Sequence, residues 1–100
     1  MKNLVFRNKD IEAFVVCWLP GQETKIHNHS DNGCILKILQ GNIDEIIYNN
    51  NLEVLKNNTL IKNDIQYIDN SIGIHKMINN DEKTVSLHIY SPPNFVPSFF

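Results

Sequence analysis

Short apolar runs, each closed by turn-forming residues, follow one another along the whole chain. Valine, isoleucine and leucine dominate these runs, while glycine, proline and asparagine separate them. Runs of this length and composition are typical of β-strands. The pattern predicts strands over residues 11–19, 25–28, 33–39, 43–48, 52–55, 59–61, 65–68, 72–78 and 84–90. No stretch has a sustained 3.6-residue period with capping residues, so no helix is expected.

The segments between these runs contain residues that commonly form turns. Turns are expected at Pro20-Gly21, at Gly41-Asn42 and over residues 49–51 and 79–81, and Pro92-Pro93 closes the last strand because proline donates no ladder hydrogen bond. The run over residues 33–39 is so apolar that both of its faces are expected to be buried. Many short strands at even spacing favour a sandwich or a closed barrel.

Length and charge exclude several classes of protein. One hundred residues, 42% of them hydrophobic, are enough for one compact domain with a small core. The net charge of −2 and the scattered lysines give neither a nucleic-acid-binding stripe nor a polybasic membrane anchor. No run is long enough to cross a membrane, and Cys17 and Cys34 do not form a disulfide framework. We therefore expect a soluble protein of a reducing compartment such as the cytoplasm.

The histidines fall on the predicted strands. His27 and His29 are separated by one residue, so in a strand both imidazoles would lie on one face, with Cα atoms about 6.7 Å apart. His75, on a later strand, could supply a third metal ligand from the opposite wall. A lone histidine in a strand is more often a packed or surface residue than a metal ligand. Whether these histidines bind a metal therefore has to be judged from the spacing of the residues around them.

That spacing forms two motifs. The first is Gly21-x5-His27-x-His29-x4-Cys34-x6-Gly41, and the second is Gly73-x-His75-x3-Asn79. Both resemble the motifs of the cupin superfamily, with Cys34 where most cupins have a glutamate ligand. The resemblance implies an all-β, cupin-type jelly-roll barrel with a metal ion inside.

Three further strings narrow the resemblance to one family. These are CWLPG from Cys17, IHNH from Ile26 and SLHIYSPP from Ser86. They resemble cysteine dioxygenases, and the likeness runs from about Phe6 to Pro93. Members of that family are considerably longer, so residues 1–100 are expected to form a single minimal barrel without the family's usual terminal segments.

The resemblance implies a metal centre and a crosslink. His27, His29 and His75 would hold iron(II) (Fe2+) as three neutral ligands, which leaves positions for a thiolate, an amine and O2. Three histidines also suit zinc, and their spacing does not separate the two metals. In this family a cysteine at the position of Cys34 forms a thioether bond with a tyrosine, which corresponds here to Tyr90. Cys17 is interpreted as plain core.

Two more groups have expected roles. Ser86, His88 and Tyr90 alternate along one strand, so they share a face and could form a hydrogen-bonded relay that orients the Tyr90 phenol. Arg7, in a Phe-Arg-Asn string that resembles the family's Arg-Asn pair, is expected to grip the substrate carboxylate with two parallel hydrogen bonds.

The resulting hypothesis is a non-haem iron oxidoreductase that converts L-cysteine to its sulfinic acid with both atoms of O2. Its partners would be a small thiol and O2, without nucleic acid or membrane, in a monomer or weak homo-oligomer. The alternatives are a dioxygenase for 3-mercaptopropionate or cysteamine, and a non-catalytic metal- or ligand-binding cupin module. The apolar residues 95–100 are expected to cover an open end of the barrel or to pack on a partner chain.

Overall fold

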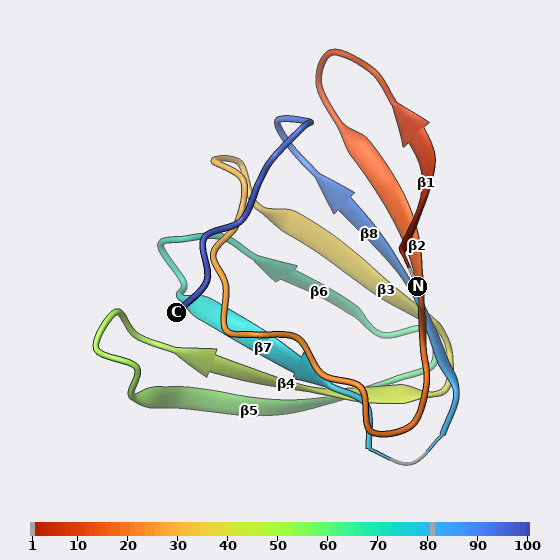
Figure 1. Cartoon of the computed structure of the whole chain (residues 1–100), viewed down its shortest axis with the longest axis vertical. Helices are drawn as coiled ribbons and strands as arrows, with labels where there is room; N and C mark the ends of the chain where they lie inside the picture. Colours follow the sequence, from red (N-terminus) through yellow and green to blue (C-terminus); the bar gives the residue numbers. More distant parts are fainter. Residues whose placement is uncertain (1, 81) are drawn as a thin grey trace.

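The computed structural model describes residues 2–80 and 82–100, and within them the secondary structure is all strand (Figure 1). The strands are β1 (Lys2–Arg7), β2 (Glu12–Trp18), β3 (Cys34–Gln40), β4 (Asn42–Tyr48), β5 (Val54–Ile61), β6 (Ile65–Ile68), β7 (Ile74–Ile78) and β8 (Thr84–Tyr90). The all-β prediction is therefore confirmed. No helix of the described residues could span a membrane.

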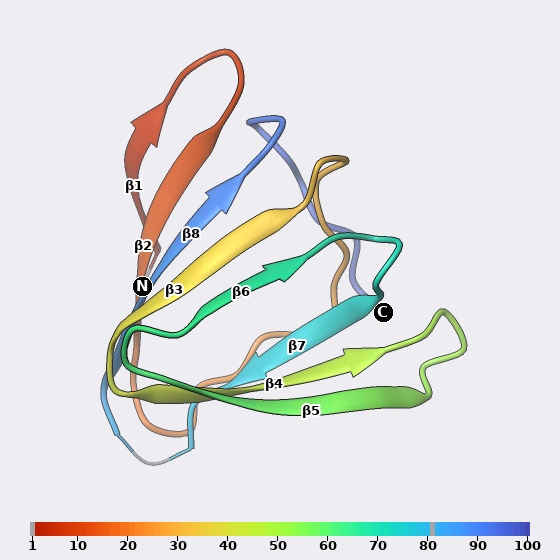
Figure 2. The same ribbon diagram turned by 180° about the vertical axis from the view of Figure 1, so that it is seen from behind.

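Two antiparallel sheets form the walls of the molecule. One has the order β1-β2-β8-β3-β6 and the other β5-β4-β7. Strands distant in sequence are neighbours, because β2 and β3 both pair with β8. Seen from behind in Figure 2, the first sheet rises steeply from the lower, flatter one. This is the crossing strand order expected of a jelly roll.

The space between the sheets holds an apolar core at one end of the barrel. Trp18, Leu36 and Ile38 come from the larger sheet and meet Ile43, Leu60 and Met77 from the smaller one. Within β3, burial alternates: Leu36 and Ile38 are fully buried, whereas Ile35 and Leu39 are 46% and 38% exposed. The expectation that both faces of this strand are buried is wrong, because only its inner face is covered by the smaller sheet.

The structure differs from the predicted strands at three other places. Strand β1 is absent from the prediction, because all of its residues are exposed and its two faces show no contrast in burial. Residues 25–28 are not a regular strand; they meet β7 through an isolated bridge at His27. β5 is one continuous strand across residues 54–61, held by its register with β4, where two short strands were expected. The expected turn over residues 79–81 includes residue 81, which lies outside the described part.

The C-terminal segment closes the barrel end that carries the candidate site. Its backbone bonds to the segment before β3, with Phe100 N donating to Ile26 O at 2.9 Å and Asn28 N donating to Ser98 O at 3.2 Å. Figure 1 shows the two segments running side by side. Of the two roles expected for residues 95–100, the structure supports the covering role.

Candidate metal centre and cavity

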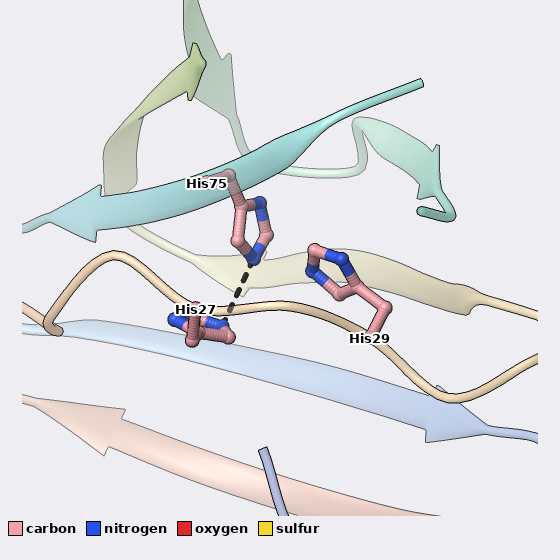
Figure 3. A group of neighbouring side chains, drawn as sticks. All are labelled: His27, His29 and His75. Carbon is pink, nitrogen blue, oxygen red and sulfur yellow. Dashed lines mark hydrogen bonds between the residues drawn. The ribbon is translucent and has the colours of Figure 1, made fainter. Parts of the chain in front are cut away.

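Three histidines from two segments converge inside the barrel. His27 and His29 lie on the segment between β2 and β3, and His75 lies on β7 (Figure 3). Reciprocal backbone bonds clamp the segments together, with His27 N donating to His75 O at 2.9 Å and His75 N donating to His27 O at 3.1 Å. One ring nitrogen of each residue lies within 4.8 Å of the others. The predicted convergence is confirmed, although a bridged loop, and not a strand, presents the first two rings.

Hydrogen bonds fix the tautomers of two of these rings. Nδ1 of His27 lies 2.8 Å from the carbonyl oxygen of Lys25, which only accepts, so Nδ1 carries the hydrogen. Nδ1 of His75 lies 2.7 Å from a carboxylate oxygen of Glu45 and is likewise the donor. In the neutral rings both Nε2 atoms then present lone pairs, and these atoms are only 3.2 Å apart (Figure 3).

Two facing lone pairs repel unless a proton or a metal ion lies between them. Burial, and then the neighbouring His75, lower the pKa of His27 to about 4, which disfavours a proton at neutral pH. Burial likewise lowers the pKa of His29 to about 2, and both of its ring nitrogens are buried without a hydrogen-bond partner. Unpartnered buried nitrogens and opposed lone pairs are what a metal ion would satisfy, so this set of residues fits a metal ion.

A buried carboxylate stands behind His75. Glu45, on β4, is fully buried and accepts hydrogen bonds from His75, from Asn58 Nδ2 at 3.0 Å and from Gln66 Nε2 at 2.8 Å. Burial alone would raise the pKa of Glu45, but these hydrogen bonds hold the pKa below its usual value, so the group is ionised. Sequence reasoning missed this residue, although Ile43, Glu45 and Ile47 share one buried face by their two-residue spacing.

A cavity of about 450 Å³ opens beside the three histidines. Its lining includes Trp18, Cys34, His88 and Tyr90, together with the three metal-binding candidates and the tail residues Phe95, Pro97 and Phe99. Cys17 also lines the cavity and is only half-buried, so its interpretation as plain core is wrong. A cavity of this size, mostly apolar and with a few converging polar groups, suits a small ligand.

Of the expected relay through Ser86, His88 and Tyr90, the structure contains the contact between Ser86 and His88. Trp18 Nε1 donates to Ser86 Oγ at 2.9 Å, and that oxygen lies 2.7 Å from His88 Nε2. Burial lowers the pKa of His88 to about 3, so its ring is neutral and can accept the serine hydrogen. The His88 and Tyr90 rings are 6.4 Å apart between centroids, and no hydrogen bond joins them among the described residues. The link to Tyr90 therefore stays a prediction.

Cys34 and Tyr90 face each other across two paired strands. They are direct partners in the register of β3 and β8, and Tyr90 packs on the cluster that contains Cys34. Burial raises the pKa of the Cys34 thiol to about 12 and also raises the pKa of Tyr90, so both groups are neutral at pH 7. Cys34 and Tyr90, the residues expected to form the crosslink, are therefore direct neighbours on adjacent strands.

Arg7 is not brought to the cavity. It lies at the far end of the β1–β2 hairpin, where its Nη2 is 2.8 Å from Glu12 Oε2 and its Nε donates to the same oxygen at 2.8 Å. Glu12 is almost completely buried, whereas the Arg7 side chain is 44% exposed. The guanidinium therefore neutralises a protein carboxylate in this structure. Among the described residues that line the cavity, Lys2 is the one lysine or arginine, and it carried no sequence signal beyond its charge.

Comparison with known proteins agrees with the fold and the motifs. Residues 1–97 match the family model described as cysteine dioxygenase type I. Cysteine dioxygenase type 1 of Rattus norvegicus is 39% identical over 101 residues, which cover 92% of this chain and 50% of that protein. The chain thus spans about half the length of the relatives it matches.

Solved structures show the same architecture at low identity. A Klebsiella pneumoniae protein with a double-stranded β-helix domain superposes with a TM-score of 0.81, at 20% identity over 99% of this chain and 77% of that one. A cupin superfamily protein from Desulfitobacterium hafniense gives 0.75, at 12% identity over 91% of this chain and 75% of that one. The predicted cupin fold is therefore confirmed, and the chain belongs to the cysteine dioxygenase family.

Proposed function

We propose that this chain forms the catalytic barrel of a non-haem iron thiol dioxygenase that converts L-cysteine to cysteine sulfinate. The observation that carries the proposal is the convergence of His27, His29 and His75 at the wall of a cavity. Hydrogen bonds set the tautomers of His27 and His75 so that their Nε2 lone pairs face each other, and the buried ring nitrogens of His29 have no hydrogen-bond partner. Family membership favours iron(II) over zinc at this point.

The reaction balances without a further reductant. The thiol sulfur loses four electrons, O2 gains four, and both oxygen atoms end on sulfur. When bound, iron(II) would supply a site that holds thiol and O2 together and permits electron transfer between them. The chain itself contributes neutral imidazoles, an apolar wall that limits water, and the Tyr90 and His88 groups that line the cavity beside the three histidines.

An oxygen-uptake assay tests this proposal. The iron(II)-loaded protein should consume O2 only when cysteine is present, and the product made under 18O2 should carry both labelled oxygen atoms. The zinc-loaded protein should consume none, because zinc has no redox chemistry. If the iron-loaded protein shows no thiol-dependent uptake with cysteine, 3-mercaptopropionate or cysteamine, the chain is a non-catalytic binding module. A preference for one of the other two thiols would change the substrate and leave the reaction class intact.

We also propose that turnover joins Cys34 to Tyr90 by a thioether bond. Each residue would lose one hydrogen, and O2 would accept both as hydrogen peroxide. The bond would immobilise the phenol beside the three histidines. We expect peptides containing Cys34 and Tyr90 to travel together after digestion of protein that has turned over, and Cys34→Ser should prevent this. The matched variant Cys17→Ser should not. Separate, unmodified peptides after prolonged turnover would contradict the crosslink.

A further inference from the structure

Two amide side chains hold the buried carboxylate that stands behind His75. Asn58 Nδ2 and Gln66 Nε2 both donate to Oε1 of Glu45, at 3.0 Å and 2.8 Å. The other carboxylate oxygen, Oε2, lies 2.7 Å from Nδ1 of His75. A carboxylate whose first oxygen accepts two hydrogen bonds cannot rotate without breaking both of them. The two amides therefore fix which oxygen of Glu45 faces the histidine ring and where that oxygen lies.

The strand register brings these groups together from both walls of the barrel. Glu45 on β4 is directly opposite Asn58 on β5, so their side chains lie on one face of the smaller sheet. Glu45 is also opposite Met77 on β7, two positions from His75, which makes Glu45 and His75 diagonal neighbours on that face. Gln66 reaches Glu45 from β6 in the larger sheet. The support of His75 thus depends on both sheets.

Neither amide cancels the charge of the carboxylate that it holds. In the part of the chain that the structure describes, no lysine or arginine lies within ion-pair distance of Glu45. Glu12, which is also buried, shows the alternative, because the guanidinium of Arg7 neutralises it. Neutral amides satisfy the buried oxygen of Glu45 and leave its negative charge to act on His75 and on an ion bound there.

We propose that Gln66 and Asn58 are positioning residues of the metal centre. They hold Oε1 of Glu45 so that Oε2 keeps the hydrogen of His75 on Nδ1, and as neutral groups they leave the carboxylate charge available to a bound divalent ion. The inference rests on the metal centre of the proposed function and goes beyond it, since neither amide is among the residues that line the cavity. Residues outside the cavity would then set how tightly the metal is held.

Zinc affinity and folding stability, measured together, test this role. Gln66→Met removes the donor at similar side-chain volume and should weaken zinc binding about 10-fold, the lower end for groups that support a metal ligand. Removing both donors, by Asn58→Leu with Gln66→Met, should cost about 100-fold. Competition with a chelator measures the affinity, and denaturant titration of the metal-free proteins measures the free energy of unfolding.

Gln66→Lys separates positioning from a merely structural role. It restores a donor to Glu45, so the protein should fold as stably as the original one. It should nevertheless weaken zinc binding at least as much as Gln66→Met, because the new ammonium cancels the carboxylate charge and repels the ion. The matched control is Asn57→Lys, which adds the same charge at an exposed position of β5. Its zinc affinity should stay within about twofold of the original, since solvent and salt screen the charge.

The 15N chemical shifts of the His75 ring report its tautomer in the metal-free protein. The original protein should carry the hydrogen on Nδ1, whereas the variant without both amides should carry a measurable fraction on Nε2. Unchanged zinc affinity in that folded variant, original affinity in Gln66→Lys, or affinities that fall only in step with stability would each overturn the proposal. If the iron-loaded protein oxidises no thiol, the proposed function fails, and zinc affinity and tautomer still decide the role of the two amides.

Discussion

Replacing His75 with alanine is expected to abolish metal binding and thiol oxidation together. His75 is the only one of the three candidate ligands that lies on a regular strand, and its backbone clamps the loop that carries His27 and His29. Substitution of residues that merely support a ligand costs about 10- to 100-fold in metal affinity, so loss of a ligand itself should cost more than about 100-fold. Metal content after chelation and reloading, together with oxygen uptake, measures the effect.

The same substitution leaves Glu45 buried without its histidine partner, which could unfold the protein. His27→Ala is the second variant, because it removes a candidate ligand and leaves the bond between Glu45 and His75 in place. The control is His88→Ala, which removes a cavity histidine outside the ligand set and should keep the metal while lowering the rate. Full metal content in a folded His27→Ala or His75→Ala protein would rule out this ligand set. Loss of metal in His88→Ala would make His88 a ligand.

Glu45→Gln is expected to weaken metal binding about 10- to 100-fold while keeping the shape of the side chain. The carboxylate of Glu45 keeps the hydrogen of His75 on Nδ1 and so keeps Nε2 free as a metal ligand. A glutamine amide can turn its NH2 group toward the ring and favour the opposite tautomer, with a hydrogen on Nε2. The affinity is measured by competition with a chelator at neutral pH.

The matched control is Glu53→Gln, an exposed residue on the loop before β5, which should not change the affinity. An unchanged affinity in a folded Glu45→Gln protein would contradict the supporting role.

The charge of Glu45 also affects the net charge of the proposed metal centre. Three neutral imidazoles would leave the full double charge of a bound divalent ion, and the ionised Glu45 would offset one of these charges through its hydrogen bond to His75.

The sequence motifs predicted the metal centre better than they predicted the strands around it. Glycine and histidine at fixed spacings mark positions where the backbone has few alternatives. At Gly73 φ is +154°, and a Cβ atom would lie 2.6 Å from the carbonyl oxygen of Tyr48. Such constraints are visible in a single sequence. Strand β1 is not, because each of its six residues is exposed and its place depends on the hairpin with β2.

What sequence reasoning could not supply is the pairing of charges across strands. Arg7 and Lys2 are both cations near the start of the chain, and nothing in their spacing says which one a carboxylate neutralises. Only the register opposite Glu12 and Val16 separates them. Glu45 is similar: its spacing places it on a buried face, but its bond to His75 requires β4 and β7 to pair with Ile47 opposite His75.

The contact between Trp18 and Ser86 has an optical consequence. Trp18 is the one tryptophan of the chain, and its indole lines the cavity while donating a hydrogen bond toward the serine–histidine pair. All tryptophan emission of this protein therefore originates at the cavity wall. A quenching metal ion or an entering thiol would change that emission directly, so filling of the cavity can be followed in real time on unlabelled protein.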